Sequence, residues 1–277
     1  MKLSLPKLRT VLSQPVVGFA PWILLAVAEG PHRVALAAGL ACALAVLTCA
    51  AGTIVGLRPK LLDITAITFF GALALTAMLA SPAAGRWLGT WSGELSTAVI
   101  AAVAALSLAA RRPFTLQYAR ESTDRAYWTT PLFLRINYVL TAVWAVAFLL
   151  TAITGYLGDG PLHQPGNSWT NWIIQIALVV LAAKFTAWYP DHATAGPAAG
   201  AGPAQPLGHL FRPLAAYCIV AGIIALLIGG TPWPAGAALI IIGLAARRAL
   251  RSSAAGHSAA AAPPPGSTAM ADIHQPS

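Results

Sequence analysis

Three features of the sequence predict an all-α fold, a polytopic bundle of about eight transmembrane helices. Of the 277 residues, 57% are hydrophobic and only 9% are charged, whereas a water-soluble domain carries about a quarter charged residues. Apolar segments of about 20 residues, the length that crosses the hydrocarbon core, recur along the chain. Lys and Arg gather in alternate loops between these segments, which is typical of multi-pass inner-membrane proteins.

The apolar segments divide the chain into a core and a hairpin. The predicted spans are residues 14–28, 34–56, 61–81, 88–110, 136–157, 169–188, 213–229 and 232–246. The first six belong to a core over residues 1–191, and an Ala/Gly/Pro-rich linker follows at 192–210. The last two form a hairpin at 211–251. The tail at 252–277 has too little apolar bulk to fold, so we expect it to be disordered.

The basic residues predict the orientation of the spans. With eight spans, 15 of the 17 Lys and Arg residues fall on one side, and only Arg33 and Arg86 fall on the other. Positively charged loops stay in the cytoplasm, so both termini are expected there. Removing the last two spans together preserves this asymmetry, and a six-span core with a loosely attached hairpin stays open. The net charge of +9 therefore indicates topology and predicts no nucleic-acid partner, because no basic stripe lies on a soluble face.

The sequence carries no signature of an ordinary enzyme or of a metal site. It lacks a P-loop, GxSxG, HExxH and a dinucleotide-binding fingerprint, the patterns that position phosphates, nucleophiles or zinc. The cysteines, Cys42, Cys49 and Cys218, have no CxxC spacing, and the six histidines are scattered. We predict no catalytic residue, metal or cofactor, and we expect the cysteines to be buried free thiols.

Polar residues inside the predicted spans are candidates for function because burial of such groups in lipid is costly. The candidates are Asp63, Glu94, Asn137, Gln175 and Lys184. Asp63 either caps its helix or pairs with Lys184 across two spans, and Lys184 otherwise extends to the interface. Glu94 either interacts favourably with the dipole at the N-terminus of its helix or has a role in proton coupling. Interhelical hydrogen bonding explains Asn137 and Gln175 better than a substrate path does.

Three polar residues of the fifth predicted span recur at helical spacing. Asn137, Thr141 and Thr151 could line one face of that span. The same residues would serve a substrate path or ordinary helix association.

The inner loop at 111–135 is the most distinctive segment. It reads as a short amphipathic helix, with Phe114, Leu116 and Tyr118 toward the membrane and its charged residues toward water. Its arginines either recognise lipid phosphates bidentately or anchor the loop while pairing with nearby Glu. The contact candidates for lipid or partner are Arg111, Arg112, Tyr118, Arg120, Glu121, Arg125 and Trp128.

Small residues in the second, seventh and eighth spans predict close helix packing. Gly39, Gly222, Gly236 and Gly243 lie in apolar segments, where a missing side chain lets two backbones approach. We expect replacement of Gly39 by Leu to disturb this packing.

The first span contains aromatic and proline residues, and an Arg-Arg-Pro junction lies at 111–113. The runs Leu134-Arg135-Ile136-Asn137 and Trp169-Thr170-Asn171-Trp172 follow. On these features the chain resembles, over residues 14–190, the intracellular septation protein A family of small inner-membrane proteins. The chain departs from the family pattern at Ile173 and Ile174, where a basic residue is expected, and in its linker, hairpin and tail.

The resemblance implies a role in envelope maintenance and division through contacts with other membrane proteins of cell-wall synthesis. The leading hypothesis is therefore a non-enzymatic protein of the bacterial inner membrane whose partners are the lipid bilayer, anionic lipid head groups and envelope-synthesis proteins. Two alternatives stay open, a small transporter or channel and a lipid-handling membrane protein.

Overall fold

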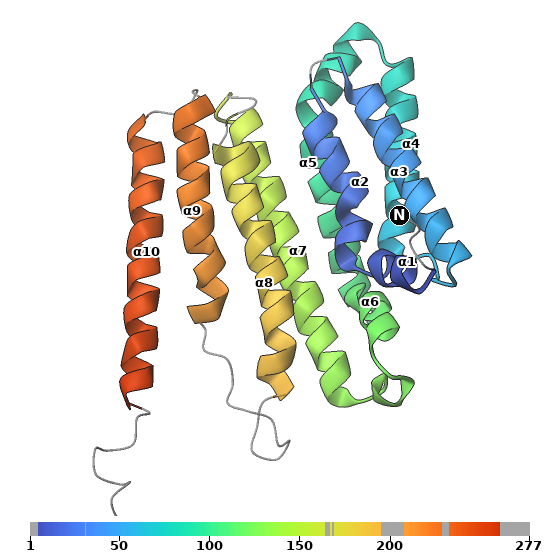
Figure 1. Ribbon diagram of the computed structural model, residues 1–277. Coiled ribbons are helices and arrows are strands. Elements are labelled where there is room, and N and C mark those ends of the chain that lie inside the picture. The colour runs from blue at the N-terminus through green and yellow to red at the C-terminus, as the bar shows by residue number, and fades with distance from the viewer. Residues whose placement is uncertain are drawn as a thin grey trace, which may run out of the picture. The chain divides into compact units, whose positions relative to one another are not determined.

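The fold is entirely helical in the part of the chain that the structure describes, which confirms the predicted all-α class. This computed structural model describes residues 5–30, 32–163, 167, 169–194, 208–228 and 233–260. The helices, shown in Figure 1, are α1 (Leu5–Leu12), α2 (Pro15–Ala28), α3 (Val34–Ile54), α4 (Leu61–Leu79), α5 (Pro82–Ala109), α6 (Thr115–Ser122), η1 (Arg125–Tyr127), α7 (Pro131–Asp159), η2 (Trp169–Ile173), α8 (Ile174–Thr194), α9 (Gly208–Ile228) and α10 (Trp233–Ala260).

Among the described residues, five helical segments are long and apolar enough to cross a membrane. They are α3, α4, α5, α7 and the continuous stretch of η2 and α8. Helix α2 is apolar but has only 14 residues, and the described apolar stretch of α9, Leu214–Ile223, is also short. The chain is therefore a multi-pass membrane protein, with five of the predicted spans meeting the length and composition of a membrane helix.

The chain divides between residues 205 and 206 into two compact units. The first unit contains α1 to α8, and the second contains α9 and α10. Helix α10 continues past the predicted hairpin end to Ala260. The rest of the predicted tail, 261–277, and most of the predicted linker, 195–207, lie outside the described residues.

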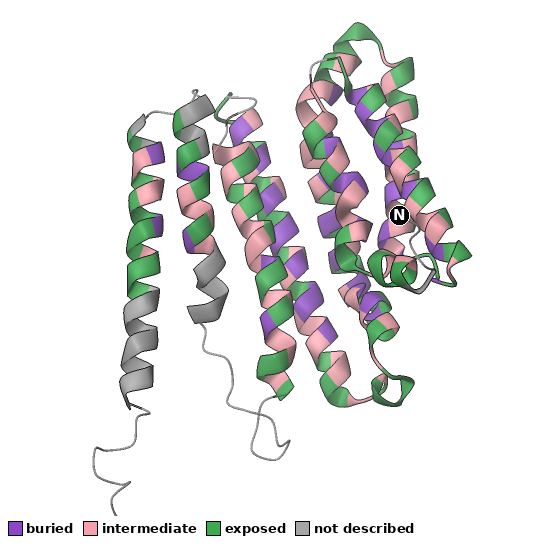
Figure 2. Cartoon of the chain, in the orientation of Figure 1, coloured by how far each residue is buried: buried purple, intermediate pink, exposed green. Residues whose placement is uncertain are grey.

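Burial is distributed as expected for helices in lipid. Large apolar side chains point outward, including Ile54, Leu79 and Met78, which are 79%, 78% and 74% exposed. The buried side of α3 carries small residues instead, among them Ala38 and Ala41. Figure 2 shows buried positions alternating with exposed ones along α3, α5 and α7. Small residues inside and large apolar residues outside are the arrangement that close packing of helices in a bilayer favours.

Aromatic rings join α2 to its neighbours at the centre of the first unit. Trp22 of α2 lies 4.8 Å from Phe70 of α4, measured between ring centroids. Phe19 lies 5.1 Å from Trp144 of α7, and the indole N–H of Trp144 donates a hydrogen bond of 2.9 Å to Thr186 on α8. Such ring pairs contribute beyond the area they bury, so α2 is held against both α4 and α7.

Glycines bring α9 and α10 together within the second unit. A Cβ added to Gly222 would lie 2.6 Å from the carbonyl oxygen of Gly236, and one added to Gly243 would lie 2.6 Å from that of Ala215. The close approach predicted for these two helices is therefore confirmed. The prediction for Gly39 is wrong, because a Cβ there meets no atom within 4 Å: this glycine faces outward from α3.

Candidate functional site

The end of α5 determines where the inner loop lies. Arg111 adopts a left-handed backbone conformation with φ of 56°, which ends the helix and reverses the chain. The Ser107 hydroxyl donates to the carbonyl of Ala104 at 2.7 Å and accepts the backbone N–H of Phe114 at 3.2 Å. The residue after the buried Pro113 is thus hydrogen-bonded back to the helix, and α6 begins directly beside the bundle.

The apolar face of α6 packs against protein, which corrects the prediction that it faces the membrane. Phe114, Leu116 and Tyr118 are all buried. Thr115 donates to the backbone carbonyl of Asn137 on α7 at 2.9 Å, and its hydroxyl lies 2.8 Å from that of Thr141. When α6 packs on the bundle, it gains hydrogen bonds to α7 and buries three large side chains. The lipid surface offers neither of these contacts.

A glycine on α2 makes room for Tyr118. A Cβ at Gly18 would overlap the Tyr118 hydroxyl. That hydroxyl is buried and has no hydrogen-bond partner among the described residues. Burial raises the pKa of the phenol well above its usual range, and the nearby carboxylates of Asp63 and Glu121 add to this effect. Tyr118 therefore remains neutral at every physiological pH and acts as a packing residue.

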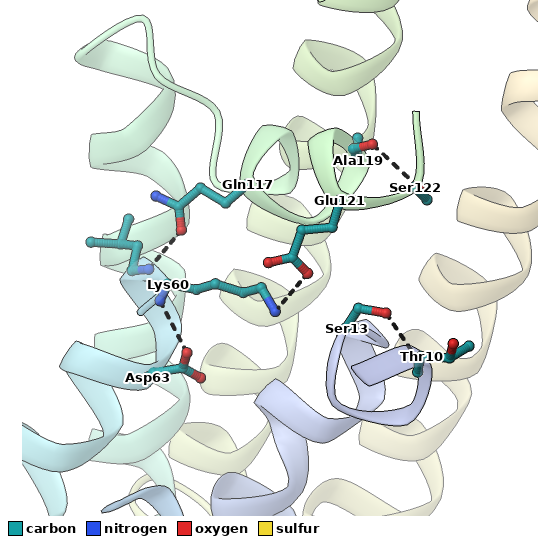
Figure 3. A network of polar contacts seen from close by, with 9 residues as sticks. Thr10, Ser13, Lys60, Asp63, Gln117, Ala119, Glu121 and Ser122 are labelled. Atoms are coloured by element: carbon teal, nitrogen blue, oxygen red, sulfur yellow. Dashed lines mark hydrogen bonds and ion pairs between the residues drawn. The ribbon is translucent and has the colours of Figure 1, made fainter. Parts of the chain in front are cut away.

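Lys60, in the loop between α3 and α4, lies at the centre of this packing. Its side chain is almost fully buried, and its Nζ lies 3.1 Å from the Glu121 carboxylate and 4.6 Å from the centroid of the Tyr118 ring. Gln117 accepts the backbone N–H of Leu61 at 2.7 Å. Figure 3 shows Gln117 and Glu121 reaching from α6 toward the start of α4, where Lys60 extends to Glu121. We call the set Lys60, Gln117, Tyr118 and Glu121 the α6 lock.

Asp63 caps its own helix, which decides between the two interpretations of this residue. Its carboxylate accepts the backbone N–H of Lys60 at 3.0 Å. The predicted ion pair between Asp63 and Lys184, both described residues, is not formed, and Lys184 is exposed on α8. A backbone N–H at the start of α4 has no helical partner, so a carboxylate three residues later satisfies it locally.

The arginines of the loop are exposed and lack acidic partners. Arg111, Arg112, Arg120 and Arg125 are exposed, and in the part of the chain that the structure describes none of them forms an ion pair with Asp or Glu. The prediction that Glu121 faces water and pairs locally is wrong. This residue turns inward to Lys60 because that ammonium is buried and needs a counter-charge.

Two of these arginines lie over one indole ring. The guanidinium carbon of Arg120 is 5.3 Å from the centroid of the Trp128 ring, and that of Arg125 is 5.6 Å away. The Trp128 N–H donates to the backbone carbonyl of Thr123 at 2.9 Å, which fixes the ring. Asp124 caps η1 by accepting the backbone N–H of Ala126 at 3.0 Å. The turn that carries both guanidinium groups is thus ordered by its own hydrogen bonds.

A small cavity lies beneath the start of α4. It is lined by residues of α1, α2, α3 and the α3–α4 loop, among them Gly18, Thr48, Cys49, Lys60 and Asp63, and has a volume of about 20 Å³. That volume is enough for one water molecule and too small for a substrate.

A second polar cluster gathers Glu29, Ser92, Glu94, Asp159, Asn171 and Gln175 from four parts of the chain. Ser92 donates to the Glu29 carboxylate at 2.9 Å, and the Asn171 amide donates to Asp159 at 2.7 Å. Burial raises the pKa of Glu29; the Ser92 hydrogen bond opposes this effect, and the charge of Asp159 adds to it.

Gly155 brings Glu94 and Gln175 together in this cluster. A Cβ at Gly155 would lie 2.6 Å from the Glu94 carboxylate and 3.1 Å from the Gln175 amide. Glu94 lies well inside α5, because that helix begins at Pro82, so a role at a helix N-terminus is excluded. One Glu94 carboxylate oxygen is buried without a hydrogen-bond partner in the described part of the chain. Among the described residues no group of three His, Cys, Asp or Glu side chains is placed to hold a metal ion.

The polar stripe of α7 faces the interior of the bundle. Asn137, Thr141 and Thr151 are 2%, 0% and 3% exposed. The Asn137 amide donates to the backbone carbonyl of Phe133 at 2.9 Å, and Thr151 donates to that of Ala147 at 2.9 Å. Asn137 and Thr141 hold α6, and Thr151 bonds its own helix, as in ordinary helix packing. The side-chain oxygen of Asn137 is buried without a hydrogen-bond partner in the described part of the chain.

Sequence reasoning missed Lys60, Gln117 and Glu29. By sequence alone, Lys60 is one of the basic residues that predict which loops lie in the cytoplasm. The spacing of Lys60 and Asp63 at a helix start was the one available signal that this segment is ordered.

Comparison with protein-family models, curated proteins and solved structures finds no match to this chain.

Proposed function

We propose that this chain is a non-enzymatic protein of the bacterial inner membrane that supports envelope organisation or septation by binding partners at α6 and η1. The observation that carries this proposal is the division of charge on the inner loop. Glu121 is paired with Lys60 inside the α6 lock, whereas Arg111, Arg112, Arg120 and Arg125 remain exposed. A surface of this kind offers unpaired guanidinium donors to an acidic partner.

Pre-organisation supports a binding role for this loop. An unstructured loop loses conformational freedom when it binds, and this loss weakens association. Here Thr115, Tyr118 and Glu121 already fix α6 to the bundle. The exposed side of α6 and η1 therefore presents its arginines without a folding step.

The proposed topology has eight spans with both termini in the cytoplasm. The α6 lock supports an even number of crossings between the α3–α4 loop and α6, since Lys60 contacts Glu121 with α4 and α5 between them. The Ser92–Glu29 hydrogen bond and the Asn171–Asp159 hydrogen bond gather the ends of α2 and α7 with η2 in the second cluster. Helix α2 and the α9–α10 hairpin supply the remaining three crossings of the proposed eight.

The proposal is tested with a fluorescent protein fused after Ser277 and imaged in dividing cells. The fluorophore matures only in the cytoplasm, so bright cells are expected from the proposed topology. Signal gathered at division sites is expected from a septation role, and replacement of Arg111, Arg112, Arg120 and Arg125 by Glu is expected to disperse it. Replacement of Arg33 and Arg86 by Glu, at two exposed positions on the predicted opposite side, is the control for charge reversal elsewhere in the chain. Uniform signal from the unaltered fusion would contradict the septation role, and dark cells would contradict the topology.

A second candidate function, transport of a proton or cation, is favoured by the meeting of Glu94 and Gln175 at Gly155. A buried carboxylate oxygen without a partner is a group that a proton or cation would satisfy. Proteoliposomes containing the full chain would then show an ion flux that Glu94→Gln abolishes. Equal flux through liposomes with and without the protein would remove this candidate.

A further inference from the structure

We propose that Arg120, Trp128 and Arg125 form a binding site for the phosphate group of an anionic phospholipid in the inner leaflet. This inference deepens the proposed function, and it rests on that function only in placing α6 and η1 at the cytoplasmic face. The ligand proposed for the exposed side of α6 and η1 is thus an anionic phospholipid.

The charge balance of the loop is the first step of the argument. Residues 111–135 contain five arginines and two acidic residues. Glu121 pairs with Lys60, and Asp124 accepts a backbone hydrogen bond within η1. Asp124 keeps its charge, but the five arginines outnumber it, so the surface carries an excess of positive charge that an anionic headgroup complements.

The geometry at Trp128 is the second step. The guanidinium carbons of Arg120 and Arg125 lie 5.3 and 5.6 Å from the centroid of the Trp128 ring, so one indole has two positive charges beside it. The interaction of a cation with a ring face leaves the in-plane N–H donors of arginine free. Those donors match the oxygens of a phosphate bidentately, and the negative charge of a bound phosphate would offset the positive charge beside the ring.

Exposed apolar groups beside the site favour a lipid over a soluble anion. Tyr127, adjacent to Trp128, is 60% exposed, and Leu132 at the start of α7 is 43% exposed. Aromatic and aliphatic side chains next to basic residues lie at the interface between headgroups and acyl chains. A phospholipid offers both a phosphate to the arginines and a chain to these two residues, whereas free phosphate offers only the first.

The test uses the purified full-length protein in detergent, titrated with phosphatidylglycerol, and counts bound lipids by native mass spectrometry. Replacement of Arg120 and Arg125 by Gln is expected to weaken phosphatidylglycerol binding roughly fivefold per guanidinium removed. The pair Arg120→Lys and Arg125→Lys keeps the charge and is expected to lose part of the affinity, because the bidentate donors are gone. Trp128→Leu keeps both arginine charges. It is expected to weaken binding because the two guanidinium groups are then no longer held by the ring.

Controls separate the possible sources of an effect. The variant Arg33→Gln with Arg86→Gln removes the same charge from exposed positions on the predicted opposite face and is expected to bind as the parent does. Equal loss in that variant, or unchanged affinity in the Arg120 and Arg125 variants, would overturn the proposal. Displacement of phosphatidylglycerol by inorganic phosphate at similar concentration would also overturn it, in favour of a soluble anion. A negative result in this lipid-binding test does not bear on the proposed septation role, because the imaging experiment measures location and not lipid affinity.

Discussion

The Lys60 ammonium lies 3.1 Å from the Glu121 carboxylate and ties the α3–α4 loop to α6. Both groups are largely shielded from solvent, and the Tyr118 ring covers the ammonium. An intact buried ion pair adds little net stability, but a single charge left behind without its partner is strongly unfavourable. The relation between Lys60 and Glu121 therefore decides whether α6 stays on the bundle.

Lys60→Met is expected to lower the stability of the protein by about 3 kcal/mol, because Glu121 then keeps a buried charge without compensation. The double variant Lys60→Met with Glu121→Leu should recover most of this loss, since it removes both charges. The melting temperature of the protein in detergent measures the effect. Lys184→Met, at an exposed position, is the control. An equal fall in melting temperature for Lys60→Met and Lys184→Met would show that the ion pair is not responsible.

Tyr118→Phe is expected to preserve the fold and to reduce its sensitivity to alkaline pH. The buried hydroxyl has no partner among the described residues, so its removal forfeits no hydrogen bond. Burial raises the pKa of Tyr118, so the unfolded chain releases the phenol proton first. The stability associated with the neutral phenol is complete below about pH 10 and declines as pH rises above it.

Melting temperatures of the parent and of the Tyr118→Phe variant should therefore diverge only above about pH 10, with the parent falling more steeply. Tyr127→Phe, at an exposed position, controls for loss of a phenol elsewhere. Parallel curves for the parent and Tyr118→Phe would contradict the buried position of the hydroxyl.

Glu29→Gln is expected to stabilise the protein at neutral pH. Burial raises the pKa of Glu29, and Asp159 adds to the effect. The fold therefore favours the protonated carboxyl: the associated stability is present below the ordinary pKa of about 4.3 and is lost as pH rises through the raised value. The amide of Gln mimics the protonated form and can still accept the Ser92 hydrogen bond. The gain in melting temperature should be present at about pH 8 and vanish at about pH 4; a gain independent of pH would contradict it.

Gly222→Ala and Gly39→Ala are expected to have opposite effects. The first places a Cβ against the Gly236 carbonyl, and overpacking of this kind lowers stability by about 1–3 kcal/mol. The second meets open space, where Ala favours a helix over Gly by roughly 1 kcal/mol. Thermal unfolding in detergent distinguishes them, and a loss in both variants would mean that α3 packs against a partner at Gly39.

Helix positions could be predicted from the sequence because apolar length alone defines a membrane segment. Helices α5 and α7 begin at Pro82 and Pro131, six and five residues before the predicted spans, because the hydroxyls of Ser81 and Thr130 cap them there. The side that each helix buries could not be predicted in this way. In lipid both the packed and the exposed faces are apolar, so hydrophobic periodicity does not separate Gly39 from Gly222.

The location of the candidate site stays a prediction, and its internal contacts could not be predicted. The arginines of the loop and Trp128 could be identified from composition and position. The inward turn of Glu121 and the burial of Tyr118 depend on Lys60 and Gly18, which are distant in sequence and carry no motif. The approach of Glu94 and Gln175 to Gly155 likewise depends on a residue whose importance lies in the side chain it lacks.

The α6 lock also has a consequence for the order in which the protein is made. A chain is synthesised from its N-terminus, so α3 and α4 enter the membrane before Glu121 leaves the ribosome. Lys60 must then wait beside the headgroups as a solvated cation, and it becomes buried only when α6 arrives and docks. The loop between α3 and α4 therefore gains its packing partner only after Glu121, nearly halfway along the 277 residues, has been translated.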